Sequence, residues 1–349
     1  MVPGDQNPKR PTLADVARIA GVSKGTVSKA LNGRDDISAA TRERILATVA
    51  DLGYRPSTQT AGTDRRAIAV VFDIPASPYI LNVLQGVLAA ATGARLDLLT
   101  RLAPALTDRG NRVTARAWIA EQRAAGAIGI VGLTLSEPDA LIDAAAEADL
   151  PFVMVDPVDT THTRMISVGS SNWAGARAAV GHLIELGHRR IAWIGGPESS
   201  SAAVDRFHGY HAALDAAGIE LDRDLVRGDQ FDVTAGARHA RDLLTLPTPP
   251  TAIVAADDEL AVGVLAAAHE LGVPVPAQLS VIGFDDTPQA EWTTPALTSV
   301  HQHLDGMGQI AVQTVLTMSE GSRPATRHLE LATSLTVRST TGPAPDAHD

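Results

Sequence analysis

The sequence predicts an α/β protein: an N-terminal three-helix helix-turn-helix domain, followed by a two-lobed core of parallel, doubly wound sheets. In residues 12–52, apolar positions recur at helical spacing. From Ala67 onward, short apolar runs alternate with alanine-rich amphipathic stretches. At 349 residues the chain is too long for one small core, so two or three packed units are expected.

The first predicted helix begins at Thr12, which can cap it with Asp15 as the reciprocal partner of a capping box. Gly21 lets the chain reverse without a Cβ clash. One face of the helix is apolar and consists of Val16, Ala17 and Ala20. The segment therefore reads as a capped amphipathic helix that ends in a tight turn.

A second helix follows, with Ser23 as its cap and with Val27 and Leu31 on the same small core. Its other face carries Lys24, Ser28, Lys29 and Asn32. This is the layout of a helix-turn-helix, whose second helix enters the major groove of DNA. An ordinary αα-hairpin with a solvated polar face is the alternative that spacing alone leaves open.

A third helix is predicted after Ser38, with Gly53 as its stop. Its apolar face comprises Ile45, Leu46, Val49 and Leu52. We therefore place a DNA-binding domain at residues 12–56, a linker at 57–66, and disordered tails at 1–11 and 341–349. Such a small domain has a thin core and is marginally stable.

Charge is distributed unevenly along the chain. Residues 1–66 hold 11 Lys and Arg against 7 Asp and Glu, whereas the remainder holds 18 against 33. All three lysines lie within the first 29 residues. A basic head on an acidic body indicates a polyanion partner for the head alone, and the favoured partner is double-stranded DNA.

The region from 67 to 340 is expected to form a two-lobed α/β core. Its apolar runs include AIAVVFDI, AIGIVGLTL, PFVMVDP, RIAWIGG, TAIVAADD and LSVIGFDD. Continuous apolar strands separated by helices indicate parallel sheets covered on both faces. Six or more such units exceed one ordinary sheet, so the region is divided into two lobes near Thr163.

Candidate ligand residues follow the predicted strands, because ligands of doubly wound sheets bind beyond the carboxyl ends of the strands. Each one alone could be a helix cap or an exposed loop charge. Carboxylates accept pairs of sugar hydroxyls, a guanidinium donates two parallel bonds, and aromatic faces pack on sugar C–H groups. The polar candidates are Asp73, Tyr79, Asp156, Arg206, Asp257 and Asp285, and the aromatic ones are Trp173, Phe231 and Tyr79.

Several function classes are disfavoured. No apolar run approaches the length of a membrane span and the polar start is no secretory signal, so a cytoplasmic protein without membrane partners is expected. There is no cysteine, and His301 with His303 lacks an obvious third ligand, so no metal is expected. The adjacent Asp285 and Asp286 diverge too much for glycosidase chemistry, and no phosphate-loop spacing occurs. We expect no enzyme and no cofactor.

The run TLADVARIAGVSKGTVSKALNGRDDISAATRERILATVADLGYRPS resembles the amino-terminal module of the LacI/GalR (lactose-repressor-like) transcription factors, and the likeness extends over roughly residues 12–340. The resemblance implies that residues 67–340 form the effector-binding and dimerisation domain. Its core would be like a type I periplasmic binding protein, with three crossings between the lobes. Lobe 1 would comprise about 67–163 and 287–320, and lobe 2 about 164–286 and 325–340.

The resemblance also implies a DNA-binding regulator, of the repressor type, controlled by a small molecule between the lobes. Arg206 and Asp285 match the family's most characteristic effector contacts. Asp257 and Phe231 stand at further contact positions, and Gln302 borders the cleft. A sugar is the first expectation. A purine or another metabolite, or a solute-binding protein without a DNA role, are the alternatives.

For DNA, the resemblance places Lys24 and Gly25 at the base-discriminating positions and Lys29 at a third. Phosphate contacts and register would fall to Thr12, Ser23, Thr26, Ser28 and Asn32, and Leu13 completes the predicted set. A homodimer on a palindromic operator is expected. Residues 57–64 lack the leucine that relatives wedge into the minor groove, so weaker operator bending is expected. The tail after Arg338 has no leucine heptad, which argues against a coiled-coil tetramer.

Overall fold

The computed structural model describes residues 12–31, 37–52, 66–73, 77–104, 111–159 and 161–345. The chain divides into two compact units between residues 64 and 65. The expected tail at 1–11, residues 346–349 of the expected tail at 341–349, most of the linker, and Asn32 lie outside the described residues. Residues 341–345 are described, and the Ala344 N–H donates to the Leu186 carbonyl at 2.8 Å.

The first unit contains three helices, α1 (Leu13–Ala20), α2 (Lys24–Leu31) and α3 (Ala39–Asp51). The capping box is present, with the Asp15 carboxylate accepting from the Thr12 backbone N–H at 2.9 Å. Gly21 adopts φ +65°, as the tight turn requires. The buried core comprises Val16, Ala17, Ala20, Val27, Ala30 and Ile45. The expectation that Leu46 joins this core is wrong: its side chain is 48 % exposed, because one residue after Ile45 lies a hundred degrees around the helix.

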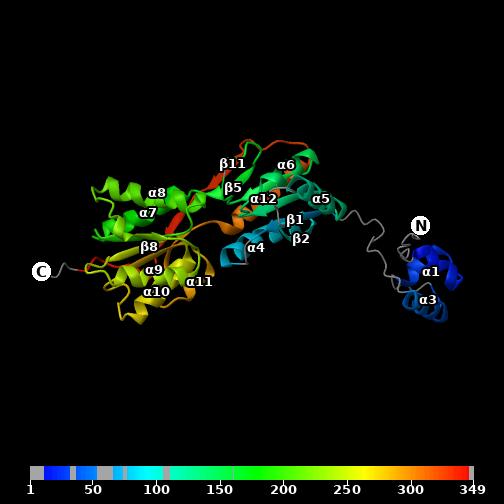
Figure 1. The fold of residues 1–349 in the computed structure, drawn as a ribbon, viewed down its shortest axis with the longest axis horizontal. Helices are drawn as coiled ribbons and strands as arrows, with labels where there is room; N and C mark the ends of the chain where they lie inside the picture. Colours follow the sequence, from blue (N-terminus) through cyan, green and yellow to red (C-terminus); the bar gives the residue numbers. More distant parts are fainter. Residues whose placement is uncertain are drawn as a thin grey trace, which may run out of the picture. The chain divides into compact units, whose positions relative to one another are not determined.

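The second unit contains two six-stranded sheets (Figure 1). The first sheet has the order β11-β5-β4-β3-β1-β2 and the second the order β12-β10-β9-β8-β6-β7. All pairings are parallel except that of β10 with β12. The strands of the first sheet are β1 (Ala67–Phe72), β2 (Asp97–Leu102), β3 (Ala127–Leu133), β4 (Phe152–Val155), β5 (Ser167–Ser170) and β11 (His328–Leu331). Those of the second are β6 (Ile191–Gly195), β7 (Val226–Gly228), β8 (Ala252–Ala255), β9 (Ser280–Asp285), β10 (Thr298–His301) and β12 (Ser334–Thr336).

Helices cover both faces of each sheet, as continuous apolar strands require. The helices of the first lobe are α4 (Pro78–Gly93), α5 (Asn111–Ala124), α6 (Asp139–Glu147) and α12 (Leu304–Ser319). Here α4 packs with α12, and α5 packs with α6. The helices of the second lobe are α7 (Asn172–Glu185), α8 (Ser201–Ala216), α9 (Val233–Leu244), α10 (Asp258–Glu270) and the short α11 (Pro288–Trp292), with the 3-10 turn η1 (Arg223–Leu225). Figure 1 shows α7 with α8 on one side of the second sheet and α9 with α10 on the other.

The expected lobe boundaries require correction. The chain passes between the sheets after β5, after β10 and after β11. Strand β5 therefore belongs to lobe 1 and β10 to lobe 2, whereas division at residues 163 and 287 assigned each to the other lobe. Strand β11 pairs with β5 in lobe 1, although 325–340 was expected in lobe 2. These short strands carry polar residues. Which lobe each strand joins therefore depends on the strand with which it pairs, and the hydrophobic pattern does not show that.

Among the described residues, none of the helices is both long enough and apolar enough to cross a lipid bilayer. The buried apolar residues of this part of the chain pack into the cores of the two sheets and of the three-helix unit.

Candidate effector site and DNA-binding helix

Arg206 lies in α8 and is only 3 % exposed. Its Nε donates to Asn172 Oδ1 at 2.7 Å, and its Nη1 donates to the Ala256 carbonyl at 2.6 Å. The guanidinium carbon lies 3.9 Å from the centre of the Phe284 ring. These contacts hold the guanidinium rigidly at the ends of β8 and β9, as a donor set in a fixed direction. The contact of Phe284 with Arg206 could not be predicted from the sequence, because the two residues are far apart along the chain.

Asp285 ends β9 and faces Arg206, with 3.5 Å between its Oδ1 and Arg206 Nη1. It adopts φ +104°, an uncommon conformation for a non-glycine residue that turns the chain sharply at the strand end. Gln302 Nε2 donates to the same Oδ1 at 2.5 Å. Gln302 occupies the crossing between β10 and α12, so this bond ties the carboxylate to the connection between the lobes. Burial raises the pKa of Asp285 well above its ordinary value, and Arg206 opposes that rise.

Tyr79 and Asp156 supply the part of the cluster in lobe 1. Tyr79 lies in the first turn of α4, and its hydroxyl donates to Asp156 Oδ2 at 2.9 Å. Burial raises the pKa of both groups, and that of Tyr79 is raised further by the charges of Asp156 and Asp285 and lowered by Arg206. The two pairs are linked geometrically through the start of α8, because Ser201 Oγ donates to the Pro157 and Val158 carbonyls, directly after Asp156, at 3.0 and 2.7 Å. We call the side chains of Tyr79, Asp156, Arg206 and Asp285, contributed by both lobes, the effector cluster.

Asp257 follows β8 and caps α10, where its Oδ1 accepts from the Leu260 backbone N–H at 2.7 Å. Burial raises its pKa to about 7. The next residue, Asp258, was not predicted. Its carboxylate accepts from the Thr287 N–H at 2.7 Å and from Ser299 Oγ at 2.5 Å, which ties α10 to β10 and to the start of α11. Asp258 therefore holds α10, β10 and the start of α11 together next to Asp257. This role could not be predicted from the sequence, because Thr287 and Ser299 are distant along the chain.

Three predicted ligand residues have other described contacts. Asp73 accepts from the Ser136 backbone N–H at 2.8 Å, beside a separate cavity of lobe 1. The Phe231 ring packs on Gly196, where an added Cβ would approach its Cζ to 2.3 Å. Trp173 is 46 % exposed, with the Arg177 guanidinium 5.6 Å from its ring centre. Within the described parts of the chain, no cluster of His, Asp or Glu side chains could hold a metal ion.

The buried carboxyls predict a pH dependence of stability. A carboxyl whose pKa is raised by folding binds its proton more tightly in the folded chain, so its contribution favours folding at low pH. For Asp257 that contribution is lost as the pH rises from about 4 towards 7. We expect the melting temperature to fall between pH 5 and pH 8, and Asp257→Asn to reduce that fall. Substituting the exposed Asp215 with Asn serves as the control, and an unchanged pH profile in Asp257→Asn would contradict the assignment.

Helix α2 has one buried and one exposed face, as expected of a DNA-reading helix. Lys24, Gly25 and Lys29 are exposed, whereas Val27 is buried against α1 and α3. An added Cβ at Gly25 would meet only Ser23 Oγ at 3.6 Å, so this part of the exposed face is open. Other residues predicted to contact DNA already make contacts within the three-helix unit or are partly buried there. Ser23 Oγ accepts from the Thr26 N–H, Thr12 forms the capping box, Leu13 packs against the core, and Ser28 is half-buried.

Comparison with known families gives two matches. Residues 12–57 match the family described as bacterial regulatory proteins, lacI family. Residues 180–341 match a periplasmic binding protein-like domain. The first match covers the three-helix unit, and the second falls within the two-sheet unit.

Individual relatives align over nearly the whole chain. The HTH-type transcriptional regulator CelR of Thermobifida fusca is 34% identical over 348 residues, which cover 95% of this chain and 98% of the relative. The lactose operon repressor of Escherichia coli strain K12 is 32% identical over 336 residues, covering 95% and 90%.

Solved structures agree with this. A transcriptional regulator CelR–cellobiose complex superposes with a TM-score of 0.70 at 32% identity, covering 95% of this chain and 100% of the other. A lac repressor dimer bound to operator and the anti-inducer ONPF gives a TM-score of 0.70 at 28% identity, covering 96% and 100%. The chain therefore belongs to the lacI family of bacterial regulatory proteins and is a DNA-binding transcriptional regulator with an effector-binding domain.

Proposed function

We propose that the protein is a cytoplasmic repressor that binds a palindromic operator as a homodimer and is controlled by a sugar held between its two lobes. Tyr79 and Asp156 would contact the sugar from lobe 1, and Arg206 and Asp285 from lobe 2. Gln302 would transmit the contact to the crossing segments. In this proposal Asp257 completes the polar set.

The observation that carries the proposal is a single rigid guanidinium among three carboxylates contributed by both lobes. Three carboxyl groups surround one guanidinium, so an anionic effector would find a single cationic partner, whereas sugar hydroxyls can donate to the carboxyl oxygens and accept from the guanidinium. The relative solved with cellobiose supports a sugar as the class of effector. A solute-binding protein without a DNA role would have no use for the three-helix unit.

Effector binding would act by closing the lobes. Two crossing segments contact each other, with Ser171 Oγ 3.3 Å from Thr333 Oγ1, and the third is joined to the effector cluster by the hydrogen bond from Gln302 to Asp285. A sugar that contacts both lobes stabilises one relative arrangement of them, and this shifts the spacing of two DNA-binding domains in a dimer.

A dimer is supported by exposed apolar side chains in the second unit. Leu81 and Leu88 are two helical turns apart on α4 and are 51% and 52% exposed, and Trp292 of α11 is 75% exposed. In the proposed dimer these apolar side chains would be covered by the second subunit, because the centre of a homodimer interface is enriched in apolar and aromatic residues.

The segment 57–64 lacks a leucine, so we propose that this protein bends its operator less than its relatives do. The segment lies outside the described residues.

The proposal is tested with the full chain in two steps. Operator sequences are selected from a randomised duplex pool, and thermal-shift screening against sugars and nucleobases identifies the effector, because a ligand that binds the folded state raises the melting temperature. We expect an enriched palindrome, and a sugar that raises the melting temperature and alters operator affinity. Stabilisation by nucleobases alone would replace the sugar with a purine-type effector.

Lys24→Ala is expected to relax sequence preference at one base pair per half-site, at a cost of roughly 1–3 kcal/mol on the preferred operator. The reason is that Lys24 is exposed at the start of α2, where a lysine can donate to guanine N7 and O6. Binding titrations on the preferred and singly altered operators measure the effect. Arg44→Ala, at an exposed position of α3, is the control. Equal weakening on every sequence would show that Lys24 contacts only phosphate.

A further inference from the structure

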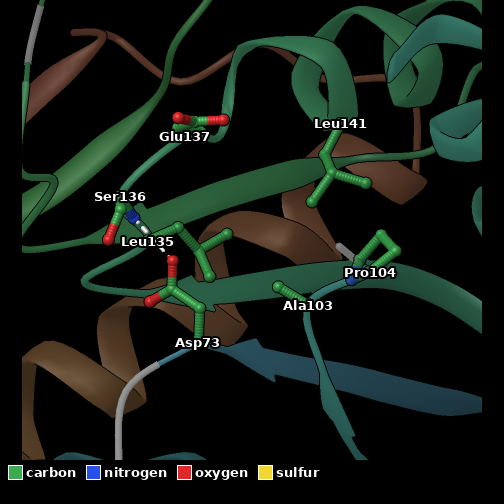
Figure 2. Close-up of a pocket in the computed structure, with 7 residues that line it drawn as sticks. All are labelled: Asp73, Ala103, Pro104, Leu135, Ser136, Glu137 and Leu141. Carbon is green, nitrogen blue, oxygen red and sulfur yellow. Dashed lines mark hydrogen bonds between the residues drawn. The ribbon is translucent and has the colours of Figure 1, made fainter. Parts of the chain in front are cut away.

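Lobe 1 contains a cavity that the proposed effector cluster does not use. It has a volume of about 320 Å³, within the range of small-molecule sites. Figure 2 shows Asp73 on one side of Ser136 and Glu137 on the other, with Leu135, Leu141, Ala103 and Pro104 forming the apolar wall. The Asp73 carboxylate is directed at the Ser136 backbone N–H (Figure 2).

The cavity lies at the place where the topology of the first sheet favours a ligand. Strand β1 is flanked by β2 on one side and by β3 on the other, so the chain order reverses between β1 and β3. Asp73 follows β1, and Ser136 follows β3. Doubly wound sheets bind ligands outside the carboxyl ends of the strands at this kind of switch point.

The cavity and the lobe 1 part of the effector cluster lie at the same carboxyl edge of the first sheet. Asp156 follows β4, which is the neighbour of β3, and the Thr134 N–H donates to the Val155 carbonyl at 3.0 Å. Thr134 adopts φ +46°, rare for a β-branched residue, and its hydroxyl is buried without a hydrogen-bond partner among the described residues. Adjacent strands are about 4.8 Å apart, so Asp156 and Asp73 follow strands separated by roughly 10 Å.

We propose that this cavity is a second sugar subsite, and that the effector is an oligosaccharide lying along the carboxyl edge of the first sheet from Asp156 towards Asp73. Asp73 and Glu137 accept from its hydroxyls, and the C–H face of a sugar ring packs on Pro104, Ala103 and Leu135. This inference rests on the proposed effector cluster, because the cavity extends that site rather than replacing it.

The subsite is tested by isothermal titration of the full chain with glucose and with β- and α-linked gluco-oligosaccharides of increasing length. In the linkage series that binds, we expect affinity to rise by about tenfold or more when one further ring reaches the cavity. Ala103→Phe fills the cavity and is expected to bring the ratio of long-sugar to short-sugar affinity close to one. Ala120→Phe, on the exposed face of α5, is the matched control and is expected to keep the ratio.

Asp73→Asn provides a second variant that leaves the cavity open, and it is expected to lower the same ratio several-fold. Asp149→Asn, at an exposed site with φ +52°, is its control. Short sugars that bind as tightly as long ones, or a ratio unaffected by Ala103→Phe, would overturn the subsite while leaving the effector cluster intact. Failure of every sugar to bind would overturn both.

Discussion

Arg206→Met is expected to destabilise the effector domain by about 3–5 kcal/mol and to abolish sugar binding. The substitution removes the buried cation that faces Asp285, and it leaves the Asn172 amide oxygen and the Ala256 carbonyl without their donor. A buried charge without its partner costs far more than an exposed ion pair contributes. Chemical denaturation and titration with the identified sugar measure the two effects.

The matched control is Arg241→Met. Arg241 pairs with Glu270 at 2.7 Å on an exposed helix surface, so its loss should change stability by about 1 kcal/mol or less. A double variant, Arg206→Met with Asp285→Asn, should recover part of the stability because the unpaired charge is removed. Wild-type stability and sugar affinity in Arg206→Met would show that this guanidinium is not part of the site.

Ile45→Ala is expected to unfold the three-helix unit and to eliminate operator binding while sugar binding persists. Ile45 is fully buried among α1, α2 and α3, and truncating such a side chain costs about 2–5 kcal/mol. A domain of about fifty residues has a free energy of unfolding of only a few kcal/mol, so a loss of this size is enough to unfold it. Gel-shift and sugar titrations on the same preparation separate the two activities.

Leu46→Ala is the control for that experiment, because the adjacent side chain is 48 % exposed. It should bind operator nearly as the wild type does. Loss of sugar binding together with operator binding in Ile45→Ala would contradict the independence of the two compact units.

Local features of the fold could be read from the sequence because they depend on neighbouring residues. The Thr12–Asp15 capping box and the turn at Gly21 are set by hydrogen bonding and steric effects within a few positions. The alternation of apolar strands with helices likewise predicts parallel sheets covered on both faces. The membership of β5, β10 and β11 could not be read, because it is decided by pairing between distant segments.

The candidate site was predictable in part. Strand-end position selected Tyr79, Asp156, Arg206 and Asp285, which the structure brings into one cluster. The same rule selected Asp73, which lies beside a separate cavity. The position of a residue at a strand end shows that it lies at the carboxyl edge of the sheet, but it does not show where along that edge. Asp258 was missed because its partners Thr287 and Ser299 are distant in sequence.

The most direct test is a reciprocal binding measurement with the full-length protein, its selected operator and its sugar. Operator affinity is measured with and without saturating sugar, and sugar affinity with and without operator. We expect both to change by the same factor, about 5–150-fold, because linkage requires reciprocity. We expect Arg206→Met to remove that coupling. Operator affinity that is unchanged by a sugar bound at the cluster would contradict control of DNA binding from this site.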